Sequence, residues 1–130
     1  GVDAPLLGVD TVVDLDGEEL PKPIDRDAAA TMLRRLAGRE HRVHTAHCLV
    51  DRHSGRAFEV TVTSVVACGP YDAAAVARYL DSGEWRGKAG AYGIQDEAQS
   101  FITLRSGPFD AVVGLAVAAV RELLRQVATP

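Results

Sequence analysis

Cysteines and long apolar runs are scarce in this chain, and each of these two shortages excludes a class of protein. Aromatic residues are also few, at 5%, which leaves the core to Val, Leu, Ala and Ile. The two cysteines, Cys48 and Cys68, are too few for the disulfide framework of a small secreted domain, and free cysteines suit a reducing cytosol. No apolar run reaches the ~18 residues of a membrane-spanning helix. The N-terminus lacks the basic-then-apolar pattern of a signal peptide. We therefore expect a cytoplasmic protein with no membrane partner.

An excess of positive charge is absent as well. The 14 Lys and Arg residues are outnumbered by 18 Asp and Glu residues, which gives a formal net charge of −4. Proteins that bind a nucleic acid duplex usually present a broad basic surface, so we expect no nucleic-acid partner. A small phosphorylated ligand is still compatible with this charge, because local cations and metal ions can outweigh a modest negative total.

The chain fits one globular domain over residues 1–130. Its composition, 47% hydrophobic and 25% charged, is enough for a single core. Strand-like and helix-like patterns alternate, which predicts strands at 6–15, 18–20, 41–50, 57–68 and 101–104, and helices at 25–37, at 72–80 and from Asp110 onward. This order indicates a mixed α/β or α+β fold.

Short local motifs predict where these elements begin and end. Asp16-Gly17 is a strong hairpin-turn signal. Asp25 and Asp72 are predicted helix N-caps, and Gly38 is placed to end the first helix in a left-handed conformation. The final helix carries an apolar stripe that indicates its core-facing side: Val113, Val117, Val120, Leu124 and Val127.

The predicted hairpin of residues 41–50 and 57–68 argues against both a disulfide bond and a zinc site. It places Cys48 near residues 59–60 and Cys68 several residues away, so a disulfide is not expected. Its first strand carries three histidines: His41, His44 and His47. On a strand the middle histidine points away from the other two, which stand roughly 20 Å apart. They therefore cannot share one zinc ion without a bulge.

The segment from Lys88 to Gln95 is the most informative loop. Glycines recur at every third position around it: Gly87, Gly90 and Gly93. Glycine costs a helix or strand roughly 0.5–1 kcal/mol relative to alanine, so we expect positive φ or close backbone approach here. Lys88 and Gln95 would offer a cation and an amide to a ligand. A purely structural turn is the open alternative.

Two further residues are candidates for chemistry. Asp10 lies in an apolar strand segment, where a buried carboxylate is costly unless it is paired, protonated or bound to metal. It is a candidate metal ligand or general base, or an acceptor for a neighbouring loop. Lys22 stands between two prolines, so its ammonium is positioned for phosphate oxygens, or is simply a solvated loop lysine.

Other catalytic signatures are missing. No serine stands in a Gly-x-Ser-x-Gly context. Gly87-Lys88 is followed by Ala89 in place of Ser or Thr, so there is no Walker A loop, and the glycine spacing also differs from the dinucleotide-binding motif.

Together these motifs resemble the Maf family of septum-formation-inhibitor-like nucleotide pyrophosphatases. Each motif is weak alone, but the ordered set is highly specific and spans almost the whole chain. The matching segments are Asp10-Thr11-Val12-Val13, Lys22-Pro23, Met32-Leu33, Leu36-Ala37-Gly38, His41-x-Val43-x-Thr45, Tyr79, Gly83-Glu84, Lys88 to Gln95 and Val112-Val113-Gly114-Leu115.

The resemblance implies a fold and an activity. The fold is a mixed sheet flanked by helices, related to the inosine triphosphate pyrophosphatases. The activity is hydrolysis of a nucleoside triphosphate to the monophosphate and pyrophosphate, with a divalent metal, usually magnesium. The resemblance also implies that Asp10 is the catalytic carboxylate and metal ligand, that Lys22 contacts phosphate, and that Lys88 and Gln95 bind substrate. The loop sequence is similar to the branch acting on dTTP and UTP.

The chain also departs from the family pattern. The N-terminal Ser-x-Ser-Pro-Arg-Arg phosphate-binding motif is absent, so the chain resembles the C-terminal part of a Maf protein. Asp96-Glu97 replaces a usual glycine and adds two negative charges beside the expected phosphate site. Two hypotheses for the function stay open. The chain is a pyrophosphatase that requires a missing or separate N-terminal segment, or it is an inactive nucleotide-binding or protein-interaction domain. The expected partner is a second copy, or a chain that supplies the N-terminal half and covers an exposed sheet edge.

Overall fold

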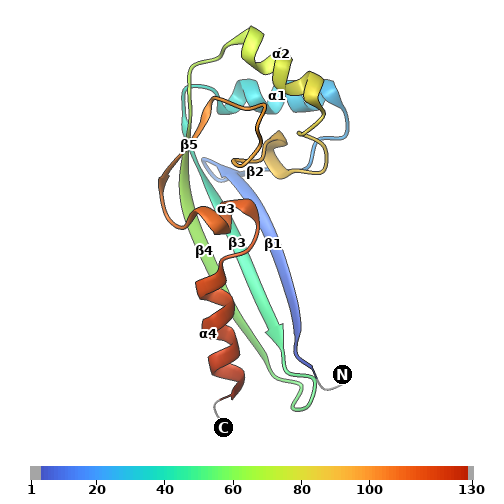
Figure 1. Cartoon of the computed structure of the whole chain (residues 1–130), viewed down its shortest axis with the longest axis vertical. Helices are drawn as coiled ribbons and strands as arrows, with labels where there is room; N and C mark the ends of the chain where they lie inside the picture. The colour runs from blue at the N-terminus through green and yellow to red at the C-terminus, as the bar shows by residue number, and fades with distance from the viewer. Residues whose placement is uncertain (1–3, 129–130) are drawn as a thin grey trace.

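A five-stranded sheet forms the body of the molecule (Figure 1). The computed structural model describes residues 4–128. In spatial order the strands run β2-β1-β3-β4-β5, with bounds β1 Leu6–Leu15, β2 Glu18–Leu20, β3 Glu40–Val50, β4 Ala57–Cys68 and β5 Ile102–Ser106. The mixed α+β class is confirmed. Every described strand pair is antiparallel, where the resemblance implied a mixed sheet.

Two hairpins form as their residues predict. Asp16 and Gly17 both have positive φ, 52° and 89°, which is the backbone geometry of the tight turns that Asp-Gly favours. Strands β3 and β4 pair along their lengths with Cys48 opposite Glu59, as expected from the sequence. Both cysteines are free.

Helices α1 (Arg26–Leu36) and α2 (Ala73–Ser82) lie together at one end of the sheet (Figure 1). The predicted caps are confirmed: the Asp25 carboxylate accepts the Ala28 N–H at 2.8 Å, and Asp72 caps α2 in the same way. Gly38 follows α1 with φ 71°. No helix in the described part of the chain is long and apolar enough to cross a membrane.

The main core lies where these two helices and the glycine loop pack against the sheet. A short 3₁₀ turn, η1 (Ala89–Ala91), lies within that loop. Fully or almost fully buried members of the core come from strands and helices alike: Val13, Leu33, Leu36, Val66 and Tyr79. The loop that carries Lys88 is therefore held against β1 by the core of the domain.

The prediction of one final helix with a core-facing valine stripe is wrong. The segment forms two helices, α3 (Phe109–Val113) and α4 (Val117–Ala128), separated at Gly114, where φ is 139°. The small residues Ala116 and Ala119 and the fully buried Leu123 face the sheet instead. Small side chains let the helix lie close to the sheet, so that Val117 and Leu124 are turned outward while Val120 and Val127 are only half-buried. Val117 and Leu124 are 46% and 47% exposed.

A pair of neighbouring leucines tests this rotation of α4. Leu123→Ala is expected to lower the free energy of unfolding by about 2–5 kcal/mol, because it leaves a cavity in the core. Leu124→Ala is expected to change it by less than about 0.5 kcal/mol. Denaturant unfolding of both variants measures the difference. A larger loss of unfolding free energy for Leu124→Ala than for Leu123→Ala would instead indicate that the stripe predicted from the sequence faces the core.

Candidate functional site

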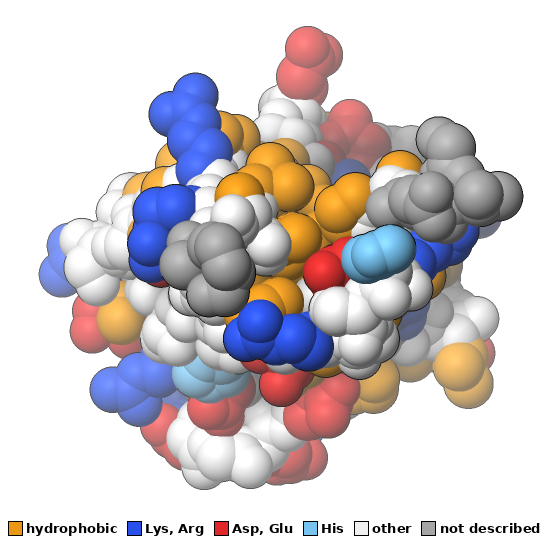
Figure 2. Space-filling model, turned by 90° about the horizontal axis from the view of Figure 1, so that it is seen from below, with side chains coloured by type: hydrophobic (Ala, Val, Ile, Leu, Met, Phe, Trp, Pro, Cys, Tyr) orange, Lys and Arg blue, Asp and Glu red, His pale blue; other side chains and the backbone are white. Residues whose placement is uncertain are grey.

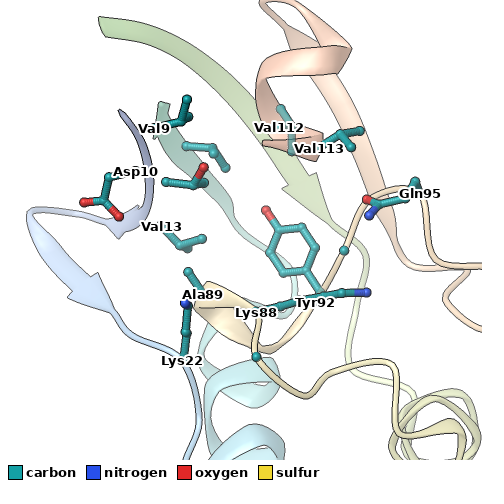
Figure 3. Close-up of a pocket in the computed structure, with 14 residues that line it drawn as sticks. Val9, Asp10, Val13, Lys22, Lys88, Ala89, Tyr92, Gln95, Val112 and Val113 are labelled. Atoms are coloured by element: carbon teal, nitrogen blue, oxygen red, sulfur yellow. The ribbon is translucent and has the colours of Figure 1, made fainter. Parts of the chain in front are cut away.

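A pocket of about 280 Å³ opens beside β1 and the glycine loop (Figure 3). Its volume is near the lower end of the range for small-molecule sites, about 300–1,000 Å³. All four candidate site residues from the sequence line it: Asp10, Lys22, Lys88 and Gln95. They come from a strand, the link after β2 and the two ends of the glycine loop. The fold thus brings together residues that lie up to 85 positions apart in the sequence.

Asp10 is exposed, so the expectation of a costly buried carboxylate at this position is wrong. Strand β2 pairs only with residues 13–15 of β1. The outer edge of β1 from residue 6 to residue 12 therefore has no strand partner within residues 4–128. The Asp10 carboxylate has no hydrogen-bond or ion-pair partner in the same described region. Asp10 borders the pocket from β1, and in Figure 3 its carboxylate points away from Tyr92 on the outer side of the strand.

Gly90 joins the loop to both β1 and the Lys22 link. Its N–H donates to the Pro21 carbonyl at 3.2 Å, and its φ is 70°. A Cβ at this position would lie 3.0 Å from Val13 Cγ1, which is tighter than ordinary contact. The expectation of positive φ and close backbone approach is confirmed here, and the contact holds the loop against Val13, which lines the pocket.

Asp96 does not face the pocket, which corrects the expectation of an added charge beside the phosphate site. Its carboxylate, 5% exposed, forms an ion pair with the Lys88 ammonium. It also accepts hydrogen bonds from the Tyr79 hydroxyl at 2.6 Å and the Gly93 N–H at 2.9 Å. Burial, reinforced by the bond to this carboxylate, raises the pKa of Tyr79. Only Glu97 of the acidic pair is exposed.

Tyr92 forms a wall of the pocket that sequence reasoning missed. Its hydroxyl and His41 Nε2 are 2.5 Å apart, and the two rings meet edge to face with centroids 5.4 Å apart. Burial lowers the pKa of His41 to about 4, so the imidazole is neutral near pH 7. The aromatic residue within the glycine motif was the available sequence signal for this wall.

The three strand histidines point as the alternation of a strand predicts. His41 and His47 are buried on the helix-covered face, and His47 Nε2 accepts the Ala116 N–H at 2.9 Å. His44 lies on the other face, where it contacts Asp14 and Thr63. Each histidine thus has a structural partner of its own.

Acidification is expected to destabilise the folded chain through His41. The folded-state pKa of about 4 lies below the ordinary 6.5, so the unfolded chain binds more protons between these values. The free energy of unfolding therefore falls as the pH falls through this window, by about 3 kcal/mol at pH 4. Denaturant unfolding at several pH values measures the slope.

The matched variants are His41→Phe, which should flatten this slope, and His53→Gln in an exposed loop, which should leave it unchanged. An unchanged slope in His41→Phe would contradict the assignment to His41.

The fold and the pocket define an α+β domain with a pocket lined by charged residues and glycines. The chain belongs to the Maf-like protein family, whose family model matches residues 2–127. It is 46% identical over 123 residues to a dTTP/UTP pyrophosphatase of Bordetella pertussis. The aligned region covers 95% of this chain and 58% of the relative. It is 44% identical over 119 residues to a nucleoside triphosphate pyrophosphatase of Xylella fastidiosa, covering 92% of this chain and 62% of the relative.

A dTTP/UTP pyrophosphatase of Escherichia coli is 44% identical over 122 residues, with 94% of this chain and 61% of the relative covered. The chain thus spans about three-fifths of the length of these curated relatives.

Proposed function

We propose that this domain binds a nucleoside triphosphate in the pocket and contributes to its hydrolysis to a nucleoside monophosphate and pyrophosphate. The observation that carries the proposal is the convergence of four separately predicted residues on one pocket: Asp10, Lys22, Lys88 and Gln95. The names of the relatives give the substrate class, with dTTP and UTP as the preferred candidates.

Each residue has a chemical role in this proposal. Lys22 is exposed at the pocket and held between prolines, so its ammonium stabilises negative charge that develops on phosphate oxygens. Asp10 is a carboxylate at the β1 border of the pocket, with no partner among residues 4–128, and it either takes a proton from the attacking water or binds a metal. Gln95, exposed on the opposite side in Figure 3, offers both a donor and an acceptor to a nucleobase.

The residues present fit the divalent metal that the family resemblance implies. Magnesium is usually held by one or two carboxylates together with substrate phosphates and water. Asp10 meets this requirement, because its carboxylate has no other partner among residues 4–128. A bound magnesium ion would supply charge neutralisation and orientation of water. We propose that Asp10 would be the protein ligand of such an ion, with the triphosphate oxygens supplying other ligands.

We further propose that a polypeptide segment with the Ser-x-Ser-Pro-Arg-Arg motif completes the site. The relatives are longer by about two-fifths of their length. The unpaired edge of β1 and exposed apolar side chains such as Leu6 and Leu124 offer a surface for such a segment. Figure 2 shows apolar side chains gathered at the lower end of the molecule between charged ones. A homodimer, in which a second copy of this chain covers the same surface, is the alternative partner arrangement. The cytoplasmic location stays a prediction.

Pyrophosphate release from dTTP and UTP with magnesium tests the proposal. The chain is assayed alone and together with a segment that supplies the missing motif. Release in either arm is expected. Calorimetric nucleotide binding without release in both arms would instead favour an inactive nucleotide-binding domain, and neither binding nor release would leave an interaction domain.

A further inference from the structure

The ammonium of Lys88 is already occupied, although the residue lines the pocket. Its partner Asp96 lies behind the pocket wall, with a side chain that is 5% exposed. That carboxylate accepts bonds from three donors: the Lys88 ammonium, the Tyr79 hydroxyl and the Gly93 N–H. A buried carboxylate with this many donors, one of them charged, is fully satisfied. The ion pair therefore cancels the charge of Lys88 within the protein.

The surroundings are shaped for this ion pair. A Cβ on Gly93 would lie 2.7 Å from Asp96 Oδ1, so the carboxylate occupies the space that any other residue at position 93 would fill. Tyr79, the second donor, is fully buried in the core. The position of Asp96 is thus fixed from two sides, unlike a surface ion pair that exchanges with solvent.

The two ends of the pocket consequently differ in charge. Lys22 has no acidic partner within residues 4–128, so it presents a full positive charge beside Asp10. At the other end, the Lys88 side chain runs below Tyr92 and away from Asp10 and Lys22 in Figure 3. With its ammonium neutralised by Asp96, that end offers an aromatic ring and the Gln95 amide in place of a cation.

We propose that Asp96 is a specificity-determining residue, which neutralises Lys88 so that the phosphates of the ligand bind at Lys22 and its uncharged base and sugar bind at the Tyr92–Gln95 end. This inference rests on the proposed function for the class of ligand. It assigns Lys88 to the loop's internal ion pair in place of direct phosphate contact. Asp96 acts through Lys88 and touches no ligand atom.

Calorimetric binding of inorganic tripolyphosphate to the full chain tests the role of Asp96. Asp96→Asn keeps an acceptor for Tyr79 but removes the charge, so Lys88 becomes available and tripolyphosphate affinity is expected to rise about tenfold. The added substitution Lys88→Met should abolish that gain. Glu97→Gln makes the same change in net charge on an exposed neighbour and should alter affinity less than about twofold.

An unchanged affinity in folded Asp96→Asn, or an equal gain in Glu97→Gln, would overturn the proposal. A second measurement needs no variant: side-chain NMR of the lysines during a tripolyphosphate titration should show shifts for Lys22 and none for Lys88. Shifts of Lys88 with Lys22 unmoved would overturn it as well. Neither measurement requires turnover, so the two proposals can fail separately. A gain of tripolyphosphate affinity through Lys88, with no pyrophosphate release from dTTP, would refute the hydrolytic proposal and leave the role of Asp96 intact.

Discussion

Asp10→Asn is expected to lower pyrophosphate release from dTTP by at least about 100-fold. An amide cannot take a proton from water and is a poor ligand for magnesium, so both candidate roles of Asp10 are lost. Because the carboxylate is exposed and has no partner among the described residues, the free energy of unfolding should change by less than about 0.5 kcal/mol. Steady-state release assays, together with denaturant unfolding, measure both quantities.

Asp14→Asn is the matched control for this loss. Asp14 lies on the same strand, outside the pocket, and its carboxylate bonds to His44 at 3.0 Å. The hydrogen bond from His44 lowers the pKa of Asp14, so its substitution should affect stability and leave release nearly unchanged. Equal losses of activity in the two variants would show that a charge on β1, rather than a group in the pocket, is responsible.

Gly90→Ala is expected to destabilise the chain by about 3 kcal/mol and to distort the pocket. An alanine at position 90 must keep the left-handed backbone conformation of the glycine. Its methyl group would also lie 3.0 Å from Val13 Cγ1. Val13 is 2% exposed and cannot move aside without disturbing the core. Thermal or denaturant unfolding gives the stability, and dTTP calorimetry reports whether the pocket survives.

Gly87→Ala separates the two causes. Its φ is 72°, close to the 70° of Gly90, but a Cβ there would meet nothing within 4 Å. It should therefore cost about 1 kcal/mol, from backbone strain alone. Similar losses in both variants would mean that packing against Val13 does not hold the loop.

Local signals allowed most of the fold to be predicted from the sequence. The Asp16-Gly17 turn and the Asp25 and Asp72 caps depend on contacts within three residues, which the residue types themselves determine. The register that places Cys48 opposite Glu59 follows from a short turn between two long strands. These features need no knowledge of distant packing.

Features set by distant packing could not be predicted in the same way. The orientation of α4 depends on how closely Ala116 and Ala119 approach the sheet, which a stripe of valines does not reveal. The exposure of Asp10 depends on β2 being too short to cover the edge of β1.

The candidate site shows the same division. Asp10, Lys22, Lys88 and Gln95 were identified from sequence, and they line one pocket. The burial of the Asp96 carboxylate could not be predicted from the sequence. It depends on Tyr79, which lies on α2 and 17 residues earlier in the chain, packing against the glycine loop.

The most direct test of a catalytic pocket at Asp10 is product analysis of dTTP incubated with magnesium, the chain and the segment that carries the missing motif. Thymidine monophosphate and pyrophosphate in equal amounts are expected, with release lost in Asp10→Asn. No release in the presence of that segment, or equal release in Asp10→Asn, would contradict the assignment.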